Sequence, residues 1–129
     1  MATACAYTRD ITREEIDELI EAFGHAASTA KERQSDGVEL HRHEGYLTDQ
    51  FTTAVRNTDE YSGDLMGRIN SVLSIIRSIC DKAGPDFSII PRCGLKHKIE
   101  GGRRIYEGIE IAKILEKHGV DALHVDAGC

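Results

Sequence analysis

The sequence predicts an α/β fold in which three helices alternate with three parallel strands. Two observations carry this prediction. Three segments repeat apolar residues at helical spacing, and a short strand-like run follows each of them after a turn signal. Parallel sheets are normally buried on both faces, and three strands with three helices leave much of a sheet uncovered. We therefore interpret the 129 residues as a segment of a (β/α) TIM barrel.

The first predicted helix begins after Thr12, which can form a capping box with Glu15. Apolar residues then recur at helical spacing as far as Ala30 and give the helix one apolar side. The turn dipeptide Asp36-Gly37 ends this segment and opens the first strand, which we expect at about Val38 to His41.

The second predicted helix presents an apolar side from Leu65 to Cys80, and Gly84-Pro85 stops it. A long loop is expected before it, from His43 to about Ser62. The second strand follows as the apolar run from Phe87 to Arg92. Pro91 inside this run removes one backbone donor from the predicted sheet.

The third helix is predicted from about Ile105 to His118, with Gly119 as its C′ residue. The last strand is the run from Ala122 to Asp126. The loop before the helix, Gly94 to Arg104, is basic. Its cationic residues either attract an anionic substrate tail such as that of CoA or form a solvated surface; they are Lys96, His97, Lys98, Arg103 and Arg104.

Composition excludes several classes of function. The formal net charge is −6 and aromatic residues make up 5% of the chain, which argues against nucleic acid as a partner. No apolar run approaches the roughly 20 residues of a membrane-spanning helix, so we expect no membrane partner and a cytoplasmic location. The four cysteines are widely spaced and are read as free thiols; they are Cys5, Cys80, Cys93 and Cys129.

Titratable side chains follow the first strand directly. Side chains alternate along a strand, so Glu39 and His41 share one side. The segment from His41 to Tyr46 then occupies the carboxyl end of a parallel strand, where active sites of such folds lie. His41, His43 and Glu44 also fit a metal-ligand pattern, but a further fixed ligand is missing from it, and no metal site is predicted.

Four blocks of the sequence resemble the old yellow enzyme class of flavin-dependent ene-reductases. The resemblance is closest to the branch that holds enoate reductases and dienoyl-CoA reductases. It covers the chain from about Thr12 to its end. The blocks are Asp36-Gly37-Val38-Glu39-Leu40-His41 with Glu44-Gly45-Tyr46-Leu47 and Asp49-Gln50-Phe51; Asn57-Thr58-Asp59-Glu60-Tyr61 with Gly63 and Arg68; Gly84-Pro85-Asp86-Phe87 leading to Arg92; and Ala112-Lys113-Ile114-Leu115 with His124-Val125-Asp126-Ala127-Gly128.

This resemblance implies one FMN-binding (β/α) barrel domain over residues 1–129, incomplete and running from about the third helix to the sixth strand. It implies NAD(P)H-dependent reduction of an alkene conjugated to a carbonyl. By position, His41 matches the residue that contacts the substrate carbonyl or the flavin edge. Tyr46 matches the tyrosine that donates a proton, and Arg92 matches an arginine facing the flavin's N1–O2 side.

The chain departs from the enoate reductase pattern in several respects, and two of them bear on the site and its cofactors. The run His41-Arg42-His43-Glu44-Gly45-Tyr46 is one residue shorter than the family's motif. Two alignments therefore stay open: either His43 is the second histidine of the substrate site, or Glu44 takes its place as in dienoyl-CoA reductases. The cysteine cluster that binds iron–sulfur in this branch is also missing, so no such cluster is expected within this chain.

The expected substrate is a small enoate or enoyl-CoA-like molecule. We expect the isolated chain to be weak or inactive, because the strands that build the rest of the flavin site are absent from it. The alternative is a non-catalytic truncated half-barrel that persists by self-association. Its open sheet edges would then pair with a second copy in a homo-oligomer.

Overall fold

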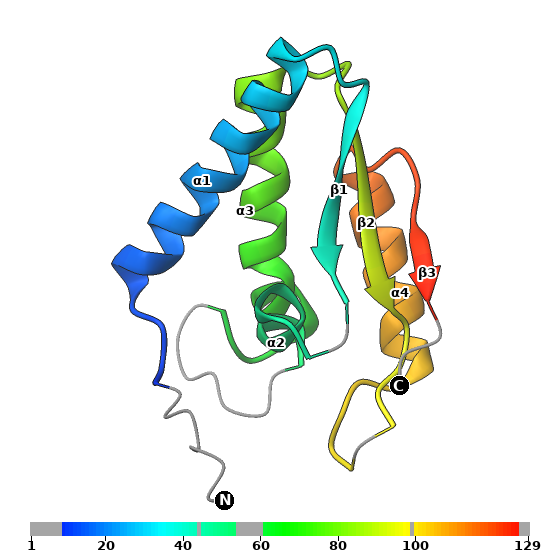
Figure 1. Cartoon of the computed structure of the whole chain (residues 1–129). Helices are drawn as coiled ribbons and strands as arrows, with labels where there is room; N and C mark the ends of the chain where they lie inside the picture. Colours follow the sequence, from blue (N-terminus) through cyan, green and yellow to red (C-terminus); the bar gives the residue numbers. More distant parts are fainter. Residues whose placement is uncertain (1–8, 44, 54–60, 99, 127–129) are drawn as a thin grey trace, which may run out of the picture.

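The computed structural model describes residues 9–43, 45–53, 61–98 and 100–126, and it confirms parallel strands that alternate with helices (Figure 1). The elements in chain order are α1 (Arg13–Glu32), β1 (Gly37–Arg42), α2 (Leu47–Thr52), α3 (Leu65–Ala83), β2 (Ser88–Gly94), α4 (Ile105–Lys117) and β3 (His124–Asp126).

The sheet has the order β1-β2-β3, and both neighbouring pairs are parallel. His41 of β1 is the register partner of Arg92 of β2, which in turn is the partner of His124 of β3. The carboxyl ends of all described strands consequently lie at one edge (Figure 1). This arrangement is the open, partial barrel that the sequence predicts.

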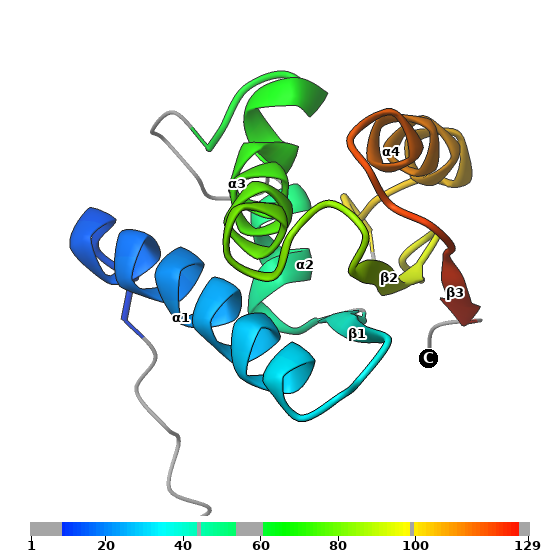
Figure 2. The ribbon, with the colours of Figure 1, turned by 90° about the horizontal axis from the view of Figure 1, so that it is seen from above.

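The two faces of the sheet differ in chemistry. Helices α3 and α4 lie over one face, and α1 packs beside α3 (Figure 2). Leu40 and Ile89 point into this side and are buried with the apolar residues of α3, such as Ile69 and Val72. Because side chains alternate, Glu39, His41 and Arg92 lie on the opposite face, which no described helix covers.

The predicted unbroken loop from His43 to Ser62 was wrong in one part, since α2 lies within it. Six residues give too short a stretch for a helical period to be recognised. Tertiary contacts hold this short helix instead: Phe51 is buried and its ring meets that of Tyr61 edge-on, with 5.8 Å between centroids. Residues 54–60, which carry part of the second family-like block, lie outside the described residues.

The predicted helix ends agree with the structure. Thr12 and Glu15 form the capping box of α1. Gly84 follows α3 with a φ of 89°, and Gly119 follows α4 with the same value. This left-handed conformation suits glycine, which explains why both helices end where the sequence indicates.

Pro91 is tolerated in the central strand because of where the third strand begins. The backbone N–H and C=O of Ile89 both bond to Asp121, so they point toward β3. Pro91, two residues further, points the same way, but the β2–β3 register begins only at Arg92. The missing N–H therefore removes no ladder bond. The last strand is also shorter than predicted, because Asp121 bonds Ile89 through its side chain.

Within the part of the chain that the structure describes, no helix is both long enough and apolar enough to cross a membrane.

Gly108 sets how closely α4 approaches the loop after β2. A Cβ at this position would lie 2.1 Å from the backbone oxygen of Leu95. We expect Gly108→Ala to lower the free energy of unfolding by about 1–3 kcal/mol, since backbone must move to make room. Denaturant unfolding measures this, with Glu116→Ala on the exposed side of α4 as the control. Equal stability of the two variants would contradict the close approach.

Candidate functional site

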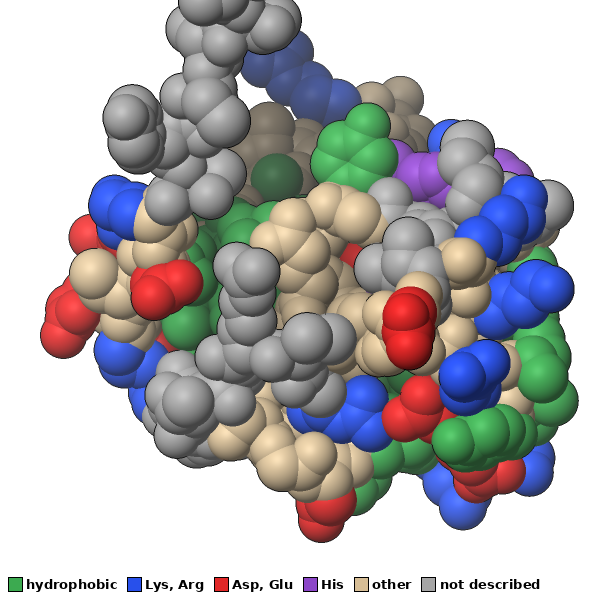
Figure 3. Space-filling model, turned by 90° about the horizontal axis from the view of Figure 1, so that it is seen from below, with side chains coloured by type: hydrophobic (Ala, Val, Ile, Leu, Met, Phe, Trp, Pro, Cys, Tyr) green, Lys and Arg blue, Asp and Glu red, His purple; other side chains and the backbone are tan. Residues whose placement is uncertain are grey.

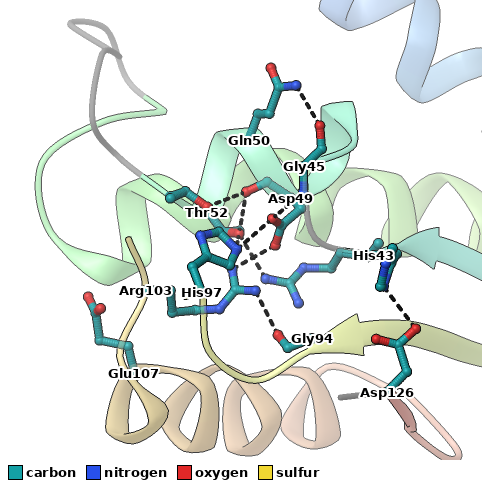
Figure 4. A network of polar contacts seen from close by, with 12 residues as sticks. His43, Gly45, Asp49, Gln50, Thr52, Gly94, His97, Arg103, Glu107 and Asp126 are labelled. Atoms are coloured by element: carbon teal, nitrogen blue, oxygen red, sulfur yellow. Dashed lines mark hydrogen bonds and ion pairs between the residues drawn. The ribbon is translucent and has the colours of Figure 1, made fainter. Parts of the chain in front are cut away.

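Charged side chains from all described strands meet at the carboxyl edge of the sheet. Arg92 Nε lies 3.0 Å from Asp126 Oδ2. His43 Nδ1 lies 2.8 Å from the same oxygen, and Figure 4 shows this pair. A second pair on the uncovered face joins His124 Nδ1 to Glu39 Oε2 at 2.8 Å. Each strand thus contributes at least one charged or titratable group that pairs with another strand or with the segment after β1.

Tyr46 joins this group through its ring. The ring meets His41 edge-on with 4.5 Å between centroids, and it lies 6.2 Å from the ring of His43. Tyr46 is 57% exposed, so it stands at the surface rather than in the core. Figure 3 views the molecule from this end and shows histidine side chains at the surface beside a hydrophobic one.

The structure therefore brings together His41, His43, Tyr46 and Arg92 of the predicted site residues. Glu44, the competitor of His43, lies outside the described residues. Among the described residues, no group of three or more His, Cys, Asp or Glu side chains is arranged to hold a metal ion. A groove of about 390 Å³ runs between α1 and α3, and none of the predicted site residues lines it.

Behind this edge lies a buried polar network that sequence reasoning missed, and Asp49 of α2 is its centre (Figure 4). Arg103 Nη1 lies 2.7 Å from Asp49 Oδ1, and His97 Nε2 lies 2.8 Å from Oδ2. Asp49 is fully buried and Arg103 is 2% exposed. Arg103 also donates to the backbone oxygen of Gly94, at the end of β2, over 2.6 Å.

Thr52 of α2 connects this network to two further arginines. Its hydroxyl oxygen accepts from Arg42 over 2.8 Å and from Arg103 over 3.1 Å. Its backbone oxygen accepts from Arg68 over 2.9 Å, and Arg68 also pairs with Glu107 over 2.7 Å. Arginines from β1, α3 and the loop after β2 therefore converge on the C-terminal end of α2.

Burial disfavours the charged forms of side chains in this region, and it shifts the pKa values of two of them. Burial, followed by the nearby charge of Arg103, lowers the pKa of Arg42 to about 10, so the guanidinium stays charged at neutral pH. Burial also raises the pKa of the Cys93 thiol, although Arg42 and Arg103 act in the opposite direction. Cys93 is therefore a neutral core side chain at the end of β2.

The basic loop does not behave as one surface. Lys96, Lys98 and Arg104 are exposed, in keeping with a solvated loop or a surface that attracts anions. Arg103 and the side chain of His97 are buried against Asp49, so neither prediction for this loop holds for these two. No local pattern reveals the pairing, because His97 and Asp49 are 48 residues apart in the chain.

Comparison with known proteins agrees with this geometry. The model of the NADH:flavin oxidoreductase / NADH oxidase family matches residues 1–128. The chain belongs to this family. It is 42% identical over 137 residues to a cinnamate reductase of Clostridium sporogenes and 43% identical over 122 residues to an NADH oxidase of Thermoanaerobacter brockii. Each alignment covers 93% of this chain, but only 21% and 19% of those relatives.

Solved structures show the same relationship. A 2-naphthoyl-CoA reductase in complex with 2-naphthoyl-CoA superposes with a TM-score of 0.84 at 34% identity, over 93% of this chain and 19% of that one. An old yellow enzyme homologue from Zymomonas mobilis superposes with a TM-score of 0.79 at 25% identity, over 95% of this chain and 36% of that one. The chain thus spans about a fifth of the length of the first relatives it matches.

The ion pair between Arg68 and Glu107 makes stability depend on pH. The hydrogen bond from Arg68 holds the pKa of Glu107 below its usual range. The ion pair therefore stabilises the fold fully above the pKa that Glu107 has in the unfolded chain. This stabilisation is lost as the pH falls through the lower pKa of Glu107 in the folded protein. We expect Glu107→Gln to lower the free energy of unfolding by about 1 kcal/mol at pH 7.

Urea unfolding of the two proteins between pH 7 and pH 3 measures this effect. The difference between them should shrink toward the acid end. Glu110→Gln serves as the control, since its pair with Lys113 is more than half exposed on both sides. A difference between wild type and Glu107→Gln that is constant with pH would contradict the assignment.

Proposed function

We propose that the residues at the carboxyl edge of the sheet form part of the active site of a flavin-dependent ene-reductase. The reaction is the reduction of an alkene conjugated to a carbonyl, with NAD(P)H as the electron source. One observation carries the proposal: the exposed ring of Tyr46 lies edge-on to His41, and His41 is the register partner of Arg92 on the uncovered sheet face. A proton donor, a carbonyl-binding group and a fixed cation thus share one surface.

The donors at this edge fit FMN. Asp126 accepts from Arg92 Nε, whereas no described residue accepts from the terminal nitrogens of Arg92, which is 38% exposed along its side chain. A cation held in this way suits the anionic form of the flavin ring system, and we assign Arg92 and His41 to the cofactor side of the site. Bound there, FMN supplies the hydride for the reaction.

His41 and Tyr46 supply the remaining chemistry. An imidazole N–H of His41 can donate to the substrate carbonyl, where negative charge develops during reduction. The hydroxyl of Tyr46 can donate the proton that completes reduction, because its ring is exposed beside His41. Edge-on contact with His41 holds the two groups at one place, as a shared substrate requires.

His43 is proposed as a second substrate-binding group. Its Nδ1 lies 2.8 Å from Asp126 Oδ2, so we assign Nε2 as the atom that binds a ligand. The alternative, Glu44, is kept as the competing assignment. We propose a small enoate or enoyl-CoA-like substrate, and two names support this class: one relative is a cinnamate reductase and one structural neighbour is a 2-naphthoyl-CoA reductase.

A chimera tests the proposal. In it, this chain replaces the matching segment of the cinnamate reductase of Clostridium sporogenes, to which it is 42% identical. We expect the purified chimera to show flavin absorption and to reduce cinnamate with NADH. A folded chimera that binds FMN but does not reduce an alkene would contradict the assignment. The 129-residue chain alone should bind FMN weakly.

Tyr46→Phe in the chimera removes only the hydroxyl. We expect alkene reduction to slow by roughly 10²- to 10⁴-fold, since a positioned general acid contributes about that much. Oxidation of NADH with oxygen as the acceptor should stay nearly unchanged, because it needs no proton from Tyr46. Tyr106→Phe, an exposed tyrosine of α4, is the matched control.

His41→Ala tests the proposed hydrogen bond from His41 to the substrate carbonyl. It should weaken the binding of phenolic or carbonyl ligands by about 3- to 10-fold, the range of one lost hydrogen bond. His124→Ala, on the same sheet face, provides the comparison.

Equal loss of alkene reduction and of NADH oxidation in Tyr46→Phe would refute the role of Tyr46 as proton donor, and water or Glu44 would be the next candidate.

Self-association is the second proposal for this chain. Strands β1 and β3 each have one side without a strand partner among the described residues, and such edges can pair with another copy. Light scattering over a range of concentrations tests this. A monomer at all concentrations would rule out the homo-oligomer.

A further inference from the structure

We propose that Asp49 is the positioning residue of this site: it holds the turn that carries Tyr46 against His41 and joins that turn to the end of β2. The catalytic meaning of this inference rests on the proposed function, because that function gives Tyr46 its role. The placement itself is a property of the fold and can be measured without turnover.

Tyr46 is not fixed by its own side chain. Its ring is 57% exposed, and its ring contacts are with His41 and, further away, His43. Its backbone is much better held, since its carbonyl oxygen accepts from the backbone N–H groups of Asp49 and Gln50, each over 2.9 Å. The backbone of the turn before α2 therefore decides where the Tyr46 side chain leaves the chain.

That turn depends on Gly45. Gly45 adopts a φ of 85°, and apart from its chain neighbours no atom lies within 4 Å of the position a Cβ would take. Two hydrogen bonds of Gly45 connect the turn to α2. Its N–H donates to Asp49 Oδ2 over 3.1 Å, and its carbonyl oxygen accepts from Gln50 Nε2 over 2.8 Å. Gln50 is exposed, so the buried carboxylate is the stronger anchor.

Asp49 is itself held from the far side. Its Oδ2 contacts His97 Nε2 and its Oδ1 pairs with Arg103, which also donates to the carbonyl oxygen of Gly94. Gly94 lies two residues beyond Arg92 on β2. One chain of buried and part-buried contacts therefore runs from the Tyr46 turn to the strand that carries Arg92.

His41 is tied to the same helix. The hydroxyl of Thr48, next to Asp49, donates to the backbone oxygen of His41 over 2.7 Å. The short helix α2 thus fixes the backbone of His41 and Tyr46 together, while Asp49 fixes α2 to the loop after β2. A helix of six residues is not stable alone, so the position of Tyr46 depends on these anchors.

The carboxylate charge matters because three donors converge on two oxygens. Asn has the same shape but offers one oxygen and an NH2 group, which cannot accept. Asp49→Asn removes the ion pair with Arg103, so α2 loses its charged link to the loop after β2, and an NH2 group takes the place of one of the two carboxylate oxygens. We expect the Gly45 turn to loosen and the Tyr46 ring to leave His41.

Two NMR measurements on the full chain test this. In the wild type, the nuclear Overhauser effect between the ring protons of His41 and Tyr46 should be present, and the Gly45 amide should be protected from hydrogen exchange. In Asp49→Asn, the ring effect should vanish and Gly45 exchange should accelerate by roughly tenfold or more. Absence of the ring effect in the wild type, or its retention in Asp49→Asn with unchanged Gly45 exchange, would overturn the proposal.

Glu107→Gln is the matched control. It also removes a carboxylate that pairs with an arginine of the network, but it makes no bond to the Gly45 turn. It should lower stability and leave both measurements unchanged, so a loss common to both variants would indicate general loosening and overturn the positioning role. Should Asp49→Asn not fold, Arg103→Lys replaces it, because lysine cannot reach Asp49, Thr52 and Gly94 together. Loss of the ring effect and faster Gly45 exchange are expected for this variant too, and their absence would overturn the proposal.

These outcomes are separate from those of the proposed function. If Tyr46→Phe leaves alkene reduction unchanged, the proton-donor role fails, while the ring contact and the Gly45 exchange still report on Asp49. If the two measurements do not respond to Asp49→Asn, Tyr46 keeps its proposed role and is positioned by other contacts.

Discussion

The burial of the Asp49 carboxylate is the constraint on which the edge of this sheet depends. A charge removed from water is tolerated only with partners in good geometry. Asp49 finds them in Arg103 and His97, both from the loop after β2. The loop after β2 and the short helix α2 therefore stabilise each other. The hydroxyl of Thr52 accepts from Arg42 and Arg103, and the carbonyl of Gly94 accepts from Arg103.

The polarity of the uncovered sheet face follows from a related constraint. Its side chains pair across strands, as Glu39 with His124 and Arg92 with Asp126, which lowers the cost of placing them on a strand. Asp126 also holds the guanidinium of Arg92 through Nε. A cation oriented before a ligand arrives loses less conformational entropy on binding. The face that the helices leave uncovered therefore carries groups that are already ordered.

Much of this could be predicted from the sequence because it depends on local patterns. Helical periodicity, the Thr12 cap and the glycines after α3 and α4 fix the long elements, and alternation along β1 places His41 at a strand end beside Tyr46. Helix α2 and the Asp49 network could not be found in this way. A six-residue helix has no readable period, and Asp49 meets Arg103 across about fifty residues of chain. One signal was present: Arg42 shares the strand side of Leu40, and a cation on a buried face requires a partner.

The contrast between the two groups of polar residues bears on how such a site can work. The rim residues His41, Tyr46 and Arg92 have to meet a ligand, so they are partly exposed and packing restrains them little. The backbone must then fix the positions of these side chains, and a backbone turn is fixed best by charge-assisted hydrogen bonds to a buried group. Asp49 provides such a bond to Gly45 from a carboxylate that is itself buried. A site whose reacting groups are exposed to a ligand therefore requires a buried group that anchors the backbone carrying them.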